Sequence, residues 1–284
     1  MTIQTIGVLG AGQMGLGISQ VAAHSGFKVL LADRELGIAE LGKKKILSQC
    51  AKLVEKGRLA TDDFAKIDAN ISPVASISDF STVDLAIEAV TENPQLKFQL
   101  FKQLDEACPP NAILATNTSS ISITTIAAQT KRPDRVAGMH FMNPVPVMKL
   151  IEGVRGIQTS QETFDLVRSA AEKMGKTFVS VRDIPGFAVN RILMPMINEA
   201  VTALYEGIAS VEDIDTAMKL GTNQPMGPLT LADFIGLDTC LAIMQVLHEG
   251  MGDSKYRPCP LLKQYVDAGW LGRKSGRGFY QYSS

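Results

Sequence analysis

The segment that most constrains the fold lies near the N-terminus, where a strand candidate, a glycine-rich turn and a helix candidate follow one another. Residues 5–33 read TIGVLGAGQMGLGISQVAAHSGFKVLLAD, with the spacing GxGxxG at Gly10, Gly12 and Gly15 and a second strand candidate that ends at Asp33. A helix that starts directly after such a turn offers unpaired N–H groups to phosphates. The order of these parts therefore predicts a dinucleotide site at this turn.

Each glycine of the turn has its own task in such a site. Gly10 permits the sharp turn, Gly12 leaves room for the pyrophosphate beside the backbone, and Gly15 lets the helix pack closely on the strand. The turn residues that we expect to contact the cofactor are Gly10, Ala11, Gly12, Gln13, Met14 and Gly15.

Asp33 and Arg34 bear on which dinucleotide is bound. A carboxylate about 20 residues beyond the turn accepts hydrogen bonds from the adenosine ribose hydroxyls of NAD. Arg34 would accommodate the 2′-phosphate of NADP, or it is a solvated residue at the start of the next helix. We expect NAD, because the Asp33 carboxylate would repel a phosphate dianion while Arg34 can extend into water. NADP remains the less favoured alternative.

Length, charge and cysteine content narrow the class of protein. The chain has 284 residues, 45% of them hydrophobic, which favours two domains over one. A net charge of −1 provides no basic field for nucleic acid or an anionic membrane. No apolar stretch reaches the ~18 residues of a membrane helix, and no signal-peptide pattern precedes the first strand. The four cysteines lack metal-ligand spacing, so we expect reduced thiols in a cytoplasmic protein without a metal.

Strand and helix candidates alternate through the first two thirds of the chain. Helices are predicted over about 35–57, 93–107 and 161–174, and strands over 71–74, 83–90, 112–116, 135–141 and 177–181. This alternation predicts an α/β fold with a Rossmann-type, doubly wound parallel sheet.

The pattern changes at the segment DIPGF, residues 183–187. Beyond it we find amphipathic helix candidates over 191–207, 211–221 and 229–251 and almost no strand candidates. We therefore predict an NAD-binding Rossmann-type domain over 1–184, followed by a smaller all-α C-terminal domain over 185–284 for substrate binding. Its helices carry more apolar surface than about 100 residues can bury, which predicts a homodimer through this domain.

The three histidines differ in context. His24 and His248 lie near the ends of helix candidates, where a histidine interacts favourably with the helix dipole. His140 instead follows a buried strand candidate at the edge of the sheet where ligands bind. With an unperturbed pKa of about 6.5, this imidazole is suited to move a proton while a cofactor moves a hydride. We predict a catalytic role for His140; the alternative is a core histidine with its hydrogen bonds satisfied.

Glu152 follows His140 by twelve residues, within the apolar segment MKLIEGV. An acid in such a segment is rarely buried without a partner. Pairing with His140 would fix the imidazole tautomer and stabilise its cation. The alternative is an exposed glutamate on an edge strand.

Six segments in this order resemble the short-chain L-3-hydroxyacyl-CoA dehydrogenases, in particular the bacterial 3-hydroxybutyryl-CoA dehydrogenases. They are GAGQMGLGI, ATNTSSISIT, GMHFMNPVPVMKLIE, PGFAVNRI, MGPLTLADFIGLD and RKSGRGFYQY, and they span essentially the whole chain. The resemblance implies NAD-dependent interconversion of (S)-3-hydroxybutyryl-CoA and acetoacetyl-CoA, in butyrate synthesis or in fatty-acid breakdown. No hydratase-like extension is present, so we expect a separate enzyme and not a fused multifunctional chain.

The resemblance also implies roles for individual residues. His140 matches the family's proton-transferring histidine, Glu152 its paired carboxylate, and Ser119 a serine that contacts substrate and cofactor. From the residues alone, Ser119 could instead be a helix N-cap, a task that Ser120 or Ser122 could share. The remaining matches are Asn190 as a substrate contact; Glu92, Lys97, Asn117, Asn143 and Lys274 as cofactor contacts; and Lys56 as a coenzyme A contact.

Some of these positions have ordinary alternatives. Lys97 and Lys274 would by themselves be read as solvated surface charges, and Lys56 before Gly57 is typical of a helix C-terminus. Asn190 lies in an apolar helix candidate, where its poor helix propensity favours a polar task.

Two other functions remain open. One is a dehydrogenase of the same fold that acts on a free hydroxyacid, such as a gulonate-type sugar acid. The other is a dinucleotide-binding structural or sensor protein without catalysis.

Overall fold

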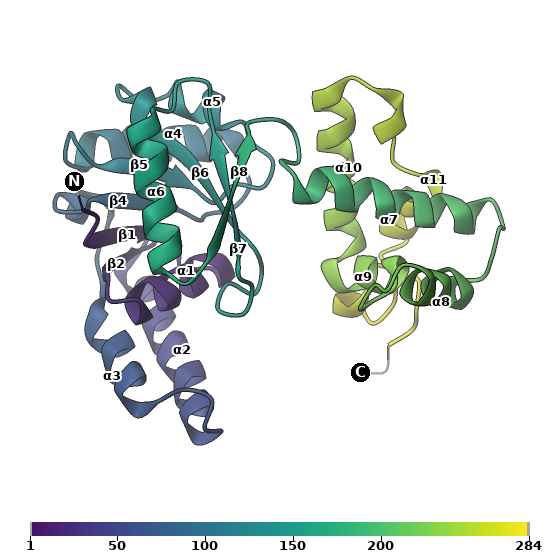
Figure 1. The fold of residues 1–284 in the computed structure, drawn as a ribbon, viewed down its shortest axis with the longest axis horizontal. Helices are drawn as coiled ribbons and strands as arrows, with labels where there is room; N and C mark the ends of the chain where they lie inside the picture. The colour runs from purple at the N-terminus through teal and green to yellow at the C-terminus, as the bar shows by residue number, and fades with distance from the viewer. Residues whose placement is uncertain (1, 283–284) are drawn as a thin grey trace. The chain divides into compact units, whose positions relative to one another are not determined.

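The computed structural model describes residues 2–282, which form two compact units that divide between Ile184 and Pro185 (Figure 1). The outer limits of the predicted domains, residues 1 and 284, lie outside the described residues.

The first unit is built on an eight-stranded sheet in the order β3-β2-β1-β4-β5-β6-β7-β8. The strands are β1 Thr5–Leu9, β2 Lys28–Ala32, β3 Ile71–Pro73, β4 Leu85–Glu88, β5 Ile113–Thr116, β6 Val136–Phe141, β7 Leu150–Arg155 and β8 Thr177–Arg182. The strands from β3 to β6 pair in parallel. They read as short apolar runs because helices cover both faces of the sheet.

The sheet is mostly parallel, as predicted, and β7 is the exception. This strand runs antiparallel to β6, and β8 then runs parallel to β7. The connection from β6 to β7 is short and holds no helix, and only antiparallel neighbours can be joined in that way. The sequence pattern of β7 did not reveal this reversal, because a buried strand looks alike in either direction.

Helices cover the sheet on both faces. They are α1 Gln13–His24, α2 Leu36–Glu55, α3 Thr61–Asn70, α4 Pro94–Ala107, α5 Ile123–Ala127 and α6 Gln161–Lys173. Apolar side chains of α1, α2 and α6 share one core cluster with the sheet, and Figure 1 shows α6 in front of the sheet and α4 behind it. Asn93 caps α4 by accepting a hydrogen bond from the N–H of Leu96, and Pro94 occupies the first turn.

The second unit is helical, as predicted. Its helices are α7 Val189–Tyr205, α8 Val211–Gly221, α9 Pro228–Ile235, α10 Leu237–Met251 and α11 Pro260–Asp267. The single helix expected over 229–251 is broken at Gly236, whose φ of +104° lies in the region that favours glycine. Within the described residues no single helix has the length and apolarity to cross a bilayer; α9 and α10 meet that test only jointly, with a bend of 98° between them.

Two buried carboxylates fasten the C-terminal segment to these helices. Asp233 accepts hydrogen bonds from the backbone N–H groups of Phe279 and Tyr280, both at 2.9 Å. The Tyr280 hydroxyl donates to Asp215 at 2.9 Å. Burial, followed by this hydrogen bond to Asp215, raises the pKa of Tyr280 to about 12.

Candidate active site

The glycine turn between β1 and α1 has the shape that a phosphate site requires. Gly10 has a φ of +108°, and a Cβ there would come within 2.6 Å of the Ala89 carbonyl oxygen. A Cβ on Gly15 would overlap the carbonyl oxygen of Gly10. At Gly12 a Cβ would meet nothing within 4 Å, so protein packing does not explain the glycine. The open space at Gly12 borders the first turn of α1, whose N–H groups favour an anion.

Asp33 accepts two backbone hydrogen bonds, one of which ties it to this turn. Its Oδ2 accepts from the Ala11 N–H at 2.6 Å, and its Oδ1 accepts from the Arg34 N–H at 2.8 Å. Each carboxylate oxygen has a second lone pair, so the group can still accept from ribose hydroxyls. The Arg34 side chain is 81% exposed and lies 3.9 Å from Glu35, which fits the solvated alternative.

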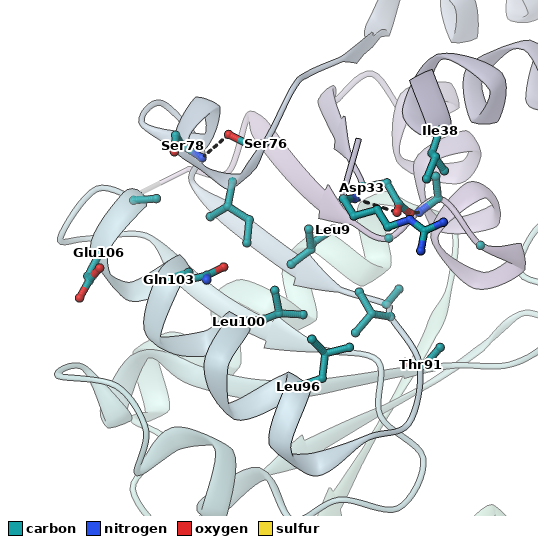
Figure 2. Close-up of a pocket in the computed structure, with 18 residues that line it drawn as sticks. Leu9, Asp33, Ile38, Ser76, Ser78, Thr91, Leu96, Leu100, Gln103 and Glu106 are labelled. Carbon is teal, nitrogen blue, oxygen red and sulfur yellow. Dashed lines mark hydrogen bonds between the residues drawn. The ribbon is translucent and has the colours of Figure 1, made fainter. Parts of the chain in front are cut away.

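A cleft of about 1140 Å³ opens beside the turn (Figure 2). Its walls come from the glycine turn, the end of β2, the segment 76–78 and one face of α4. Leu96, Leu100, Gln103 and Ala107 recur every three or four residues, so they share that face of α4. The sequence patterns did not identify this wall, although the same spacing could have indicated it.

The residues present fit a dinucleotide. Four features lie together: the open Gly12, the first turn of α1, the fixed Asp33 carboxylate and the cleft. Gly12 and the first turn of α1 suit the pyrophosphate, and Asp33 suits the adenosine ribose. The cleft is larger than the ~300 Å³ of a small ligand site.

His140 and Glu152 face one another on neighbouring strands. They are register partners in the antiparallel pair of β6 and β7, and Nδ1 of His140 lies 2.8 Å from Oε2 of Glu152. Both side chains are buried, and Glu152 is only 1% exposed. Glu152 is therefore not the exposed edge-strand residue of the alternative, because β8 covers that side of β7. The carboxylate beside Nδ1 favours the tautomer in which Nδ1 carries the hydrogen.

The connection that follows His140 is held from two sides. The Gln13 side chain, in the first turn of α1, donates to Oδ1 of Asn143 at 3.0 Å. Lys176 donates through Nζ to the carbonyl oxygens of Val145 at 2.5 Å and Met148 at 2.8 Å. Burial lowers the pKa of Lys176. The predicted cofactor residues Gln13 and Asn143, far apart in the chain, thus lie side by side.

Glu92 accepts several hydrogen bonds from the loop that carries Ser119. Its Oε1 accepts hydrogen bonds from the N–H groups of Ser119 and Ser120 and from the hydroxyls of Thr118 and Ser120. Burial by itself would raise the pKa of Glu92, but the charge of Lys97 and these hydrogen bonds lower it overall. The N-cap of α5 is Ser122, which accepts from the N–H of Thr125, so Ser119 does not serve as the cap.

Lys97 is not a solvated surface charge, and that expectation is wrong. It is 1% exposed, and its Nζ lies 2.6 Å from Glu88 Oε1 and 3.3 Å from Glu92 Oε2. Lys97 lies in the first turn of α4, and its side chain points inward to Glu88, the last residue of β4. Glu88, an acid within the apolar run VDLAIEAV, could have signalled a buried partner nine residues later.

Asn117 connects this loop to the strand of His140. Its Oδ1 accepts from the N–H of Phe141 at 2.9 Å, and its own N–H donates to the carbonyl oxygen of Glu88 at 2.8 Å. The loop with Ser119 is thereby fixed next to the end of β6, where His140 lies.

The remaining predicted site residues belong to other elements of the chain. Lys56 is exposed and caps the C-terminus of α2. Asn190 is the second residue of α7 and not an interior one, so its low helix propensity carries less weight than we expected. Lys274 is exposed and pairs with Asp238 at 2.6 Å. His24 and His248 lie in the last turns of α1 and α10, as predicted.

Comparison with known protein families agrees with the dinucleotide site that the glycine turn and Asp33 indicate. Residues 5–184 match the family described as 3-hydroxyacyl-CoA dehydrogenase, NAD binding domain, and residues 186–282 match the C-terminal domain of that family. The chain belongs to the 3-hydroxyacyl-CoA dehydrogenase family. The resemblance seen in the sequence is thereby confirmed.

Individual relatives in the 3-hydroxyacyl-CoA dehydrogenase family match over the full length. A protein of Bacillus subtilis named "Probable 3-hydroxybutyryl-CoA dehydrogenase" is 58% identical, with 99% of this chain and 98% of the relative covered. A 3-hydroxybutyryl-CoA dehydrogenase of Bradyrhizobium diazoefficiens is 52% identical, with 99% and 96% covered. The crystal structure of the (S)-3-hydroxybutyryl-CoA dehydrogenase of Ralstonia eutropha superposes with a TM-score of 0.97 at 49% identity and covers 100% of both chains. As a 3-hydroxyacyl-CoA dehydrogenase, the chain is an NAD-binding oxidoreductase.

Proposed function

We propose that the chain interconverts (S)-3-hydroxybutyryl-CoA and acetoacetyl-CoA with NAD, and that His140 is the general acid and base. The observation that carries the proposal is the buried hydrogen bond between His140 and Glu152 at the end of the sheet where the cofactor turn lies. The substrate is taken from full-length relatives that are named as 3-hydroxybutyryl-CoA dehydrogenases.

The protein residues divide the work as follows. His140 accepts the hydroxyl proton during oxidation and returns it during reduction, and Glu152 stabilises the imidazolium that forms. Ser119 and Asn190 contact the substrate, on the strength of the family resemblance. NAD, when bound, accepts or supplies the hydride at the substrate's C3. The cofactor contacts are those expected from the sequence, with Asp33 on the ribose.

The direct test is oxidation of NADH with acetoacetyl-CoA, followed by its absorbance. We expect turnover with the CoA ester and none with free acetoacetate. Turnover of the free acid alone would instead favour a hydroxyacid dehydrogenase. Replacing His140 with glutamine should reduce turnover by about 10²- to 10⁴-fold and leave NADH binding nearly unchanged. Near-normal turnover of this variant would remove His140 from the mechanism.

A homodimer through the helical unit is part of the same proposal. Large apolar side chains of this unit are exposed in the single chain, namely those of Ile192, Tyr205, Ile208, Leu220 and Phe234. Burial of such side chains against a second copy would be favourable. Sedimentation equilibrium at micromolar concentration should give twice the chain mass, and a monomer would contradict the proposal.

The four free, buried cysteines support a reducing, cytoplasmic location.

A further inference from the structure

Glu88, the last residue of β4, is a carboxylate with no exposed surface. It accepts hydrogen bonds from the Val90 N–H at 2.7 Å, from Lys97 Nζ at 2.6 Å and from the Thr116 hydroxyl at 2.7 Å. A buried charge is costly unless it is paired and hydrogen-bonded, and these three donors satisfy it. Two of these donors, Lys97 and Thr116, are also connected by further contacts to the loop that carries Ser119.

The first route runs through Lys97. The Lys97 ammonium lies between Glu88 and Glu92, and Glu92 holds the N–H groups of Ser119 and Ser120 at 2.9 and 3.1 Å. The Lys97 ammonium lies nearer to Glu88, at 2.6 Å, than to Glu92, at 3.3 Å, so Glu88 holds the ammonium in place. The position of the ammonium in turn favours the orientation in which Glu92 directs Oε1 at the loop.

The second route runs through Thr116. Glu88 and Thr116 are register partners at the ends of β4 and β5. A hydroxyl has one hydrogen, and Thr116 donates it to Glu88. The hydroxyl oxygen therefore faces Thr118 as an acceptor, and the Thr118 N–H donates to it at 3.1 Å. Both routes converge on residues 118–120.

We propose that Glu88 is a positioning residue for the dehydrogenase reaction, which holds Lys97 and Thr116 and through them the loop with Ser119. The inference rests on the proposed function, in which Ser119 contacts the substrate and cofactor. Glu88 itself is enclosed by protein and acts through its partners.

The test is Glu88→Gln, which keeps the side-chain shape but removes the charge that Lys97 requires. Lys97 is then left with Glu92 as its carboxylate partner, so Glu92 should release the loop. We expect kcat/KM for acetoacetyl-CoA to fall by about 10- to 100-fold, because small displacements of contact groups are costly. We also expect faster amide hydrogen exchange in residues 117–122, measured by mass spectrometry without substrate or cofactor.

Asp105→Asn is the matched control. Asp105 forms a partly buried ion pair with Arg132 in the same unit, at 2.7 Å, and no hydrogen bond connects it to residues 118–120 among those described. This variant should melt at a lower temperature but keep the wild-type kcat/KM and exchange in 117–122. Equal losses in both variants, or unchanged exchange in Glu88→Gln, would overturn the positioning role.

Two further results keep the outcome decisive. If Glu88→Gln does not fold, Thr116→Val removes one route alone and should increase exchange in 117–122, and unchanged exchange would overturn the role. If wild-type protein does not reduce acetoacetyl-CoA, the proposed function is wrong, and the exchange measurement still decides whether Glu88 holds the loop.

Discussion

His140 and Glu152 lie opposite one another on antiparallel strands, with Nδ1 and Oε2 2.8 Å apart. The pair spans twelve residues of sequence, and the turn of the chain between β6 and β7 brings the two side chains together. Both are buried, so their interaction is weakly screened by solvent. The proposed proton transfer depends on this contact.

Glu152→Gln should therefore impair catalysis more than binding. The amide keeps the size of the side chain but does not supply the negative charge that stabilises the imidazolium. We expect kcat to fall by about 10²-fold while the dissociation constant for NADH changes little. Steady-state kinetics and fluorescence titration measure the two quantities. An unchanged kcat would show that Glu152 has no part in the proton transfer.

Asp33 should determine the preference for NADH over NADPH. Its carboxylate is fixed by Ala11 and Arg34, so it cannot easily turn away from a 2′-phosphate. We expect a higher kcat/KM with NADH in the wild type, and Asp33→Ser should narrow the difference by about tenfold or more. A higher kcat/KM with NADPH in the wild type would contradict this preference.

The lowered pKa of Glu92 predicts a loss of stability in acid. Burial opposes the shift, but Lys97 and the loop hydrogen bonds outweigh it and place the folded pKa below the ordinary 4.5. The stabilisation from the charged form is thus present above the unfolded pKa and is lost as pH falls through the folded pKa. At pH 7 the wild-type protein should have a higher melting temperature than the Glu92→Gln variant. This difference in melting temperature should shrink below about pH 4.5. Calorimetry across this pH range measures it, and a constant difference would contradict the shift.

Lys56 should contribute to coenzyme A affinity. Lys56→Ala is expected to raise the KM for acetoacetyl-CoA by about tenfold at low salt with little change in kcat, because a phosphate contact acts in the ground state as well. Lys44→Ala is the control, since Lys44 is also exposed but lies about 120° around α2. Equal effects of the two variants would indicate a general charge effect and not a contact.

The sequence predicted the parts of the fold that depend on local patterns. The turn at Gly10 and the helix predicted over 93–107 are local features of this kind, since backbone conformation and helix formation depend on residues close in sequence. The break at Gly236 was missed, because an apolar pattern continues across this glycine.

The sequence by itself determined the glycine turn, its acid at Asp33 and the succession of strands and helices, because these follow from residue spacing and backbone preference. The tertiary structure alone decided that β7 reverses direction, that Lys97 is buried between Glu88 and Glu92, and that the cleft has α4 as a wall. These features depend on which elements lie side by side. The acid Glu88 within an apolar run indicates a buried partner, but which residue pairs with it, and in which direction β7 runs, depend on contacts between elements that local spacing does not specify.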